Sequence, residues 1–254
     1  LAVNLSDLAA MGAAPAWGTL ALSLPQAETA WIDGFAEGFF ALADAHDWRL
    51  IGGDTTRGPL SLSVTAFGQV PQGQALRRDG ANVGDEVWVS GTLGDAAGAL
   101  QLWQRGRLDV SRPAHDPEHE FLRQRLLRPT PRVALGIALR GLAHAAVDLS
   151  DGLLADLGHI ATRSCVSAHV ETHLLPTSSS ARQVLGEALV CEAAMRGGDD
   201  YELCFTAPAS HTEAIHAVAD ELQLPLTRIG RIAAGQGVHV DGTAARGGYQ
   251  HFTP

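Results

Sequence analysis

Residues 145–160 read AAVDLSDGLLADLGHI, and the order of residue types in this stretch indicates a strand that passes directly into a helix. Small and apolar residues before Asp148 predict a buried strand, and GLLADLGHIATR at 152–163 predicts the helix. Asp148 and Asp151 are three positions apart across this junction, so both carboxylates can face one cation. Ser150 lies between them and can donate a hydrogen bond to a phosphate oxygen near the helix N-terminus.

Two other segments have the same design, in which a strand ends in a small-residue turn that carries acids: GGDTTRG (52–58) and GGDDYE (197–202). Glycines let the backbone come close to a phosphate, and carboxylates bind Mg²⁺ through oxygen. We therefore expect Asp54 in a turn that follows a strand. Acids and glycines are also ordinary turn formers, and Asp151 could simply cap its helix. An acidic chain that uses this design three times nevertheless favours the binding of Mg²⁺ and phosphate.

Near the start of the chain, NLSDLAAMGA at 4–13 predicts a short helix that Asn4 caps and Gly12 ends. Asp7 is then expected in the first turns of that helix. The helix dipole favours an acid at such a position whether or not it binds a metal. The spacing alone therefore leaves both interpretations of Asp7 open.

Strands and helices alternate on both sides of these segments, which predicts a mixed α/β fold. Residues 70–85 are rich in turn formers and poor in apolar residues, so we predict a domain boundary near residue 82, with domains at 1–82 and 83–254. In the first domain the patterns predict strands at 17–24 and 60–70, a helix at 27–46, and a further strand that leads into the glycine-rich turn. In the second domain they predict helices near 94–105, 118–127, 131–141, 152–163, 178–194 and 210–222, with strands at 86–91, 144–150 and 166–171, one after the GGDDYE turn, and two at the end of the chain.

The charge of the chain excludes several classes of protein. The 254 residues include 18 arginines, no lysine and 28 acids, which gives a net charge of −10. This balance repels nucleic acid, and the lack of lysine excludes a P-loop, whose lysine reaches the terminal phosphates of a nucleotide. No apolar run approaches the roughly 20 residues that cross a bilayer, so we expect no membrane span.

The cysteines and the first residues bear on the cellular compartment. Cys165, Cys191 and Cys204 are odd in number and widely spaced, which indicates neither a disulfide framework nor a zinc site and favours a reducing cytoplasm. The chain opens with neither an initiator Met nor a basic segment before an apolar one, so we expect no signal peptide. We interpret the sequence as part of a longer protein.

Seven segments, in this order, resemble the thiamine-monophosphate kinase family: NLSDLAAMGA, IGGDTTRG, RRDGANVGDEVWVSGTLGDAAGAL, LRPTPRVALG, AAVDLSDGLLADLGHI, GGDDYELCFT and GYQHF. The resemblance implies ATP-dependent phosphorylation of thiamine monophosphate to thiamine diphosphate by direct in-line transfer, with no enzyme nucleophile. It also implies a superfamily shared with aminoimidazole ribonucleotide synthetase and selenophosphate synthetase. In that synthetase-like fold an N-terminal domain dimerises through its sheets and a C-terminal domain is α/β, so the resemblance implies a homodimer.

The resemblance also assigns roles to particular residues of this chain. It implies that Mg²⁺ is bound by Asp7, Asp54, Asp148 and Asp151, that ATP is contacted by Gly53, Arg78 and Ser150, and that thiamine monophosphate is contacted by Asp199 and Tyr249. A tyrosine ring can stack on a flat cationic heterocycle, and a nearby acid suits the positive charge of that ring.

Two departures from the family pattern leave alternatives open. Family members carry further sequence ahead of NLSDLAAMGA, where several metal and substrate ligands would lie, and they often have Glu where this chain has Asp199. One alternative is a related ATP-dependent synthetase of the same superfamily that activates another substrate. The other is a non-catalytic module that binds Mg²⁺ and nucleotide and dimerises.

Overall fold

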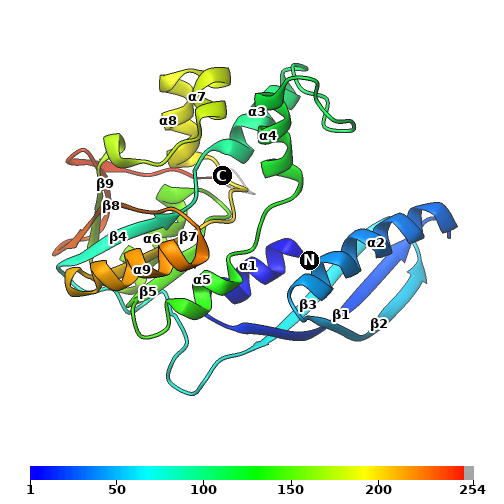
Figure 1. The fold of residues 1–254 in the computed structure, drawn as a ribbon, viewed down its shortest axis with the longest axis horizontal. Helices are drawn as coiled ribbons and strands as arrows, with labels where there is room; N and C mark the ends of the chain where they lie inside the picture. The colour runs from blue at the N-terminus through cyan, green and yellow to red at the C-terminus, as the bar shows by residue number, and fades with distance from the viewer. Residues whose placement is uncertain (249–254) are drawn as a thin grey trace.

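Two β-sheets with helices packed on them organise residues 1–248, which are the residues that the computed structural model describes (Figure 1). The smaller sheet has the order β2-β1-β3 and consists of β1 (Ala14–Leu24), β2 (Arg49–Arg57) and β3 (Ser61–Gln69). Strand β1 is parallel to β2 and antiparallel to β3. The predicted mixed α/β class is confirmed.

The larger sheet has the order β10-β9-β6-β8-β4-β7-β5 and combines parallel with antiparallel pairs. Its strands are β4 (Asp85–Ser90), β5 (Ala145–Asp148), β6 (Ser167–Val170), β7 (Leu203–Pro208), β8 (Leu226–Ala233), β9 (Gly237–Val240) and β10 (Thr243–Ala245).

The helices of the described chain are α1 (Ala2–Ala10), α2 (Thr29–Ala45), α3 (Asp95–Gln104), α4 (Pro117–Leu127), α5 (Val133–Ala138), α6 (Leu153–Arg163), α7 (Ser179–Leu185), α8 (Glu187–Arg196) and α9 (Thr212–Leu222), with short 3₁₀ helices at Thr172–Leu174 and Ala209–His211. Among residues 1–248, no helix combines the length and the apolar character needed to cross a membrane.

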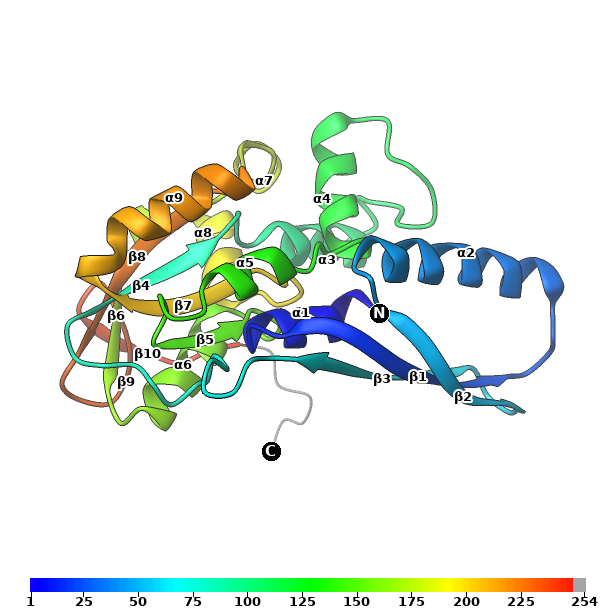
Figure 2. The same cartoon turned by 60° about the horizontal axis from the view of Figure 1, so that its bottom comes forward.

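The smaller sheet projects from the rest of the molecule, and α2 covers one of its faces (Figure 2). Phe39 of α2 packs edge-on against Trp48, with ring centroids 5.8 Å apart, and both side chains are almost fully buried. Removal of these rings from water stabilises the contact between helix and sheet. On the opposite face Asp54, Ala21 and Ser63 form one row across the three strands, and all three are exposed. We call this side of the smaller sheet, with its row Asp54, Ala21 and Ser63, the uncovered face.

The prediction that Asp54 lies in a turn is wrong, because β2 continues through Arg57. Gly53 is a strand residue with φ +148°, and its backbone approaches β1 so closely that a Cβ would lie 1.9 Å from the Leu20 carbonyl oxygen. The glycine therefore allows two strands to pair rather than a turn to form. Glycine and aspartate usually mark turns, and strand pairing overrides that local preference here.

Helix α1 starts earlier than the sequence predicts. Leu1 is its N-cap, so Asn4 lies inside the helix and donates from Nδ2 to the Val64 carbonyl oxygen at 3.3 Å. The predicted Asn4 cap is wrong because this side chain is used by a carbonyl group of β3. Asp7 therefore lies in the second half of the helix and not in its first turns. Gly12, with φ +65°, follows the end of the helix as expected.

Helix α1 packs against α5 and β5 of the larger sheet, far along the sequence. Gly136 of α5 allows the close approach, because a Cβ there would lie 2.0 Å from the Ala9 carbonyl oxygen. Leu5 and Ala9 are fully buried in this contact region. The packing brings the middle of α1, including Asp7, to the C-terminal end of β5.

Candidate active site

Asp148, the last residue of β5, accepts a hydrogen bond at Oδ2 from the Ser6 hydroxyl of α1 at 2.9 Å. Only 3% of Asp148 is exposed, and burial is the main reason why the pKa of its carboxyl is raised. The Ser6 hydrogen bond opposes this rise, and the neighbouring Asp7 carboxylate adds to it. The structure thus brings two of the predicted magnesium ligands together.

The positive charge of Arg78 acts on the pKa values of both Asp7 and Asp148. Partial burial raises the pKa of Asp7, and the charge of Arg78 opposes that rise. Arg78 also acts in the same direction on Asp148, so its guanidinium lies within electrostatic reach of both acids. The exposed side chain comes from the irregular segment between the two sheets. The structure therefore brings Arg78 to the same site as Asp7 and Asp148.

The loop from β5 to α6 is shaped from within by Asp156. Its buried carboxylate accepts hydrogen bonds from the amides of Asp151 and Gly152, both at 3.0 Å. Burial raises the pKa of Asp156 to about 7, and the Asp151 amide opposes this rise. Gly152, not Asp151, is the N-cap residue of α6. Asp151 is therefore free of the capping role that the sequence left open.

Residues 197–202 pair with this loop through their backbone. The Asp199 amide donates to the Ser150 carbonyl oxygen at 3.0 Å, and the Tyr201 amide donates to the Leu149 carbonyl oxygen at 2.9 Å. Asp199 and Tyr201 have φ values of +68° and +49°, in the left-handed region that non-glycine residues avoid. Each such residue costs on the order of 1 kcal/mol and persists where the surrounding structure holds it.

The glycines of this turn allow segments of the chain to touch. A Cβ at Gly198 would lie 2.3 Å from the Ser150 carbonyl oxygen, and one at Gly197 would lie 2.2 Å from Cβ of Ala97 on α3. The first glycine joins the turn to the β5–α6 loop, and the second joins it to α3. Local geometry alone therefore requires glycine at both positions.

A cleft of about 830 Å³ opens between α3 and these two loops. Its lining comprises Ala97, Leu100, Gln101, Gln104, Ser150, Asp151, Arg196, Gly197, Gly198, Asp199, Tyr201 and Gly248. Three predicted site residues, Ser150, Asp151 and Asp199, are thus walls of one cleft. Partial burial raises the pKa of Asp199, and the nearby Asp151 carboxylate adds to the rise.

Tyr201 is a cleft residue that the sequence analysis missed. Burial raises the pKa of its phenol to about 12, and four carboxylates add to the effect, those of Asp199, Asp148, Asp7 and Asp151. Four of the predicted acids therefore lie within electrostatic reach of one phenol. The available signal was its position in GGDDYE, two residues after Asp199, where strand-like alternation would point both side chains to one side.

Other predicted residues lie elsewhere. Gly53 and Asp54 are in β2 of the projecting sheet, and the Asp54 side chain accepts a hydrogen bond from the Thr55 amide at 2.9 Å. Within residues 1–248, no group of three or more His, Cys, Asp or Glu side chains has an arrangement that could hold a metal ion. Tyr249 lies outside the described residues.

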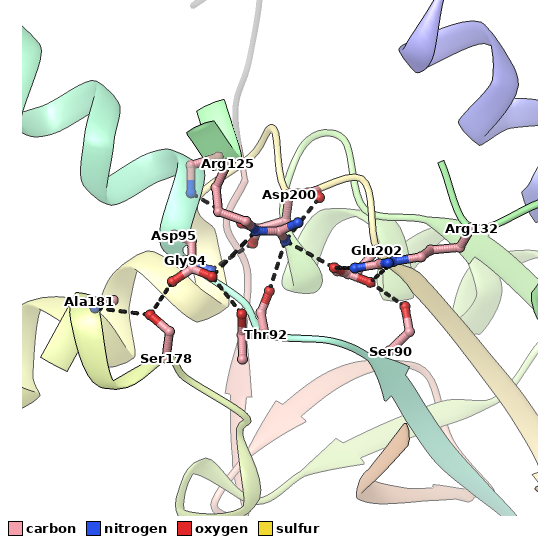
Figure 3. Close-up of polar contacts among 11 residues, drawn as sticks. Ser90, Thr92, Gly94, Asp95, Arg125, Arg132, Ser178, Ala181, Asp200 and Glu202 are labelled. Carbon is pink, nitrogen blue, oxygen red and sulfur yellow. Dashed lines mark hydrogen bonds and ion pairs between the residues drawn. The ribbon is translucent and has the colours of Figure 1, made fainter. Parts of the chain in front are cut away.

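A buried ionic network behind the turn also escaped the sequence analysis (Figure 3). It joins Asp200 and Glu202, which alternate with the two cleft residues, to Arg125 and Arg132. Asp200 and Glu202 are 2% and 0% exposed, so the arginines meet them away from water. In the sequence, only their place directly before the apolar strand β7 hints at burial.

The comparisons with known proteins agree with this fold. Residues 1–70 match the family described as AIR synthase related protein, N-terminal domain, and residues 82–242 match AIR synthase related protein, C-terminal domain. The fold and the acid-bearing strand ends therefore define the class of AIR synthase related proteins.

Individual relatives are more specific. The chain is 47% identical to thiamine-monophosphate kinase of Salmonella typhimurium, over 99% of this chain and 78% of that protein. The crystal structure of thiamine-monophosphate kinase from Stenotrophomonas maltophilia K279a is 68% identical, with a TM-score of 0.95 over 96% of this chain and 77% of that one. The structure of AaThiL complexed with AMPPCP and TMP is 33% identical, with a TM-score of 0.87 over 99% and 78% of the two chains. The chain belongs to the thiamine-monophosphate kinase family.

Proposed function

We propose that the acid-lined cleft is where this chain phosphorylates thiamine monophosphate to thiamine diphosphate with ATP, by direct in-line transfer. The carrying observation is that Ser150, Asp151, Asp199 and Tyr201 line one cleft at the end of β5, where α1 also meets Asp148 through Ser6. Family membership supports the same reaction, since relatives over the whole chain are thiamine-monophosphate kinases and AaThiL has been crystallised with AMPPCP and TMP. The chain is an ATP-dependent kinase.

The donor set at the end of β5 suits Mg²⁺. Burial and the Asp7 carboxylate both raise the pKa of Asp148, so the ionised form of this acid is favoured when a cation lies beside it, and Arg78 acts in that direction. Mg²⁺ typically takes one or two carboxylates and completes its shell with water and substrate phosphates.

In this proposal Asp7, Asp148 and Asp151 bind clustered Mg²⁺ ions at the end of β5, with one or two of these carboxylates on each ion, and Asp54 binds Mg²⁺ from the projecting sheet. Bound Mg²⁺ neutralises charge on the polyphosphate, which otherwise repels the anionic second substrate. Of the nucleotide contacts, Ser150 lies on the wall of the cleft and Arg78 beside the acids, whereas Gly53 lies in the projecting sheet.

The remaining residues orient the acceptor. Asp199 contacts the cationic part of thiamine monophosphate from the turn, and Tyr249 stacks on it. The phosphate oxygen of thiamine monophosphate is itself the nucleophile, so the chain supplies position and charge rather than a covalent group. Asp156 holds the shape of the β5–α6 loop, and the positive φ values of Asp199 and Tyr201 define the turn 197–202. Both segments therefore have their shape before the substrate binds.

We also propose that the chain forms a homodimer through the uncovered face of the smaller sheet. Trp17 and Phe67 are cross-strand neighbours on this face, 39% and 46% exposed. Large exposed aromatic side chains on an uncovered sheet face are typical of an interface that another sheet covers. A cytoplasmic location, favoured by the unpaired cysteines, stays a prediction.

Chromatographic detection of thiamine diphosphate, formed from ATP, Mg²⁺ and thiamine monophosphate, tests the proposed reaction. We expect product from this chain or from the full gene product that contains it, and ADP that depends on thiamine monophosphate. ADP release that ignores thiamine monophosphate would favour a related synthetase. Magnesium-dependent nucleotide binding with no product from either protein would favour a non-catalytic module.

A further inference from the structure

The carboxylate of Glu202, just before β7, is held from several directions at once (Figure 3). Arg132 forks onto it, with Nε 2.7 Å from Oε2 and Nη2 2.5 Å from Oε1. Arg125 donates from Nη2 to Oε1 at 3.0 Å, and the Ser90 hydroxyl donates to Oε2 at 2.5 Å. A fully buried carboxylate with a bidentate arginine and two further donors has little freedom to move.

The same groups also hold the backbone around Glu202. Ser90 Oγ accepts the amide of Leu203 at 2.9 Å, which fixes the residue that follows. Arg125 Nη2 lies 3.4 Å from the Asp200 carbonyl oxygen, two residues earlier. These donors come from the end of β4 and from α4, and Arg132 comes from the segment just before α5. Three separate elements therefore converge on one turn.

Asp200 ties the turn to the other wall of the cleft. Its carboxylate accepts the amides of Gly94 at 2.7 Å and Ala96 at 3.4 Å, at the N-terminus of α3. Ala97 and Gln101 of this helix line the cleft opposite the turn. The position of α3 relative to the turn is thus held by a buried side chain.

Side chains of the turn alternate between two environments. Asp199 and Tyr201 face the cleft and have positive φ, whereas Asp200 and Glu202 are buried in the network. A non-glycine residue leaves the left-handed region unless its neighbours prevent it. The buried anchors at 200 and 202 therefore impose the backbone that presents residues 199 and 201 to the cleft.

We infer that Arg132 and Arg125, through Glu202, are positioning residues that set the turn 197–202 and hence the placement of Asp199 and Tyr201. They act from behind the cleft, since neither arginine lines it. The consequence for thiamine monophosphate rests on the proposed function. The effect on the turn itself does not, and it can be measured without substrate.

Arg132→Gln is the first test, because Arg132 sits at the edge of the network with 18% of its side chain exposed. We expect faster amide hydrogen exchange in peptides that cover 198–203. We also expect KM for thiamine monophosphate to rise about tenfold, as misplaced positioning groups can produce, while KM for ATP changes little. Arg132→Lys keeps the charge but not the fork, so it should recover part of both effects.

Arg123→Gln is the matched control. Arg123 is a similarly buried arginine on α4 that pairs with Glu120 and the Val110 carbonyl oxygen, away from the turn. We expect it to lower the melting temperature comparably, with exchange at 198–203 and KM for thiamine monophosphate unchanged. Equal effects of both variants on exchange and KM would show a general loss of stability and overturn the inference.

A double-mutant cycle supplies the decisive comparison. If Arg132 acts by placing Asp199, Arg132→Gln should raise KM about tenfold in the parent chain and about twofold or less in an Asp199→Asn background. A tenfold effect in both backgrounds, or unchanged exchange at 198–203, would overturn the positioning role. If neither this chain nor the full gene product showed thiamine-monophosphate-dependent activity, the proposed function would be contradicted instead, and hydrogen exchange would still decide the anchoring.

Discussion

Asp148 ends β5 with its carboxylate almost fully buried, and its properties depend on residues more than 140 positions away in the sequence. Ser6 and Asp7 of α1 act on it in opposite directions, one by a hydrogen bond and the other by like charge. Its neighbour Asp151 lies on the wall of the cleft, within reach of Asp199. The two acids of one short motif therefore occupy different environments.

Substitution of these two acids tests their proposed role. We expect Asp148→Asn or Asp151→Asn to lower turnover at least tenfold, about 1.4 kcal/mol of barrier, because each removes negative charge that would hold Mg²⁺ and polyphosphate. Steady-state formation of thiamine diphosphate measures the effect. Asp33→Asn, at an exposed acid of α2, is the control and should leave turnover unchanged. Near-normal activity of both site variants would contradict the metal role.

Asp200 predicts a pH dependence of stability. Burial raises its pKa to about 7, opposed by the Gly94 amide and Arg125 and assisted by Asp95. The folded chain then keeps a proton on Asp200 that the unfolded chain releases near pH 4, so this contribution to stability is present at low pH and lost as pH rises toward 7.

Urea unfolding of the parent chain and Asp200→Asn between about pH 4 and 8 measures this contribution. The free energy of unfolding of the parent, relative to the variant, should fall with rising pH and level off above about 7. A difference that stays constant over the whole range would show that Asp200 keeps an ordinary pKa.

Elements meet at glycines in this molecule. Gly136 lets α5 approach α1, Gly53 lets β2 pair with β1, and Gly198 lets the turn touch the β5–α6 loop.

Most predicted helices and strands are present with ends shifted by a few residues. The helical region predicted at 178–194 is divided by Gly186, with φ +78°, and the chain end has a third strand, β10. Weak or short elements of this kind depend on neighbours for their stability.

Gly198→Ala tests the contact between the turn and the β5–α6 loop. A methyl group 2.3 Å from the Ser150 carbonyl oxygen must displace one segment, so we expect a loss of about 1–3 kcal/mol in stability and reduced turnover. Gly34→Ala, at an exposed position of α2 where a Cβ meets no atom within 4 Å, should instead stabilise by about 0.5–1 kcal/mol. Denaturant unfolding measures both. Unchanged stability of the first variant would show that the two segments separate freely.

At the scale of the whole molecule, two sheets are joined through α1, which starts the chain but packs on the larger sheet. The larger sheet and its loops carry the cleft, whereas the smaller sheet projects with one face uncovered (Figure 2). Asp54 lies on that face, apart from the other predicted ligands. The boundary near residue 82 stays a prediction.

A substitution on the uncovered face tests the proposed dimer. We expect the chain to sediment as a dimer, and Phe67→Asp to shift it to monomer with unchanged circular dichroism, because a charge there opposes burial. Phe40→Asp is the matched control, since Phe40 is 45% exposed but lies on α2. Monomeric parent protein, or a dimer that survives Phe67→Asp and dissociates with Phe40→Asp, would contradict an interface on this face.

The sequence by itself determined the mixed α/β class, the β5–α6 junction and the spacing of Asp148, Ser150 and Asp151, because periodicity and turn chemistry act over a few neighbouring residues. Only the tertiary structure decided that Asp7 meets Asp148 and that the glycine of β2 pairs with β1. It also decided that Glu202 and its two arginines hold the turn of Asp199. These features arise from burial and from contacts between distant segments, which local patterns do not encode.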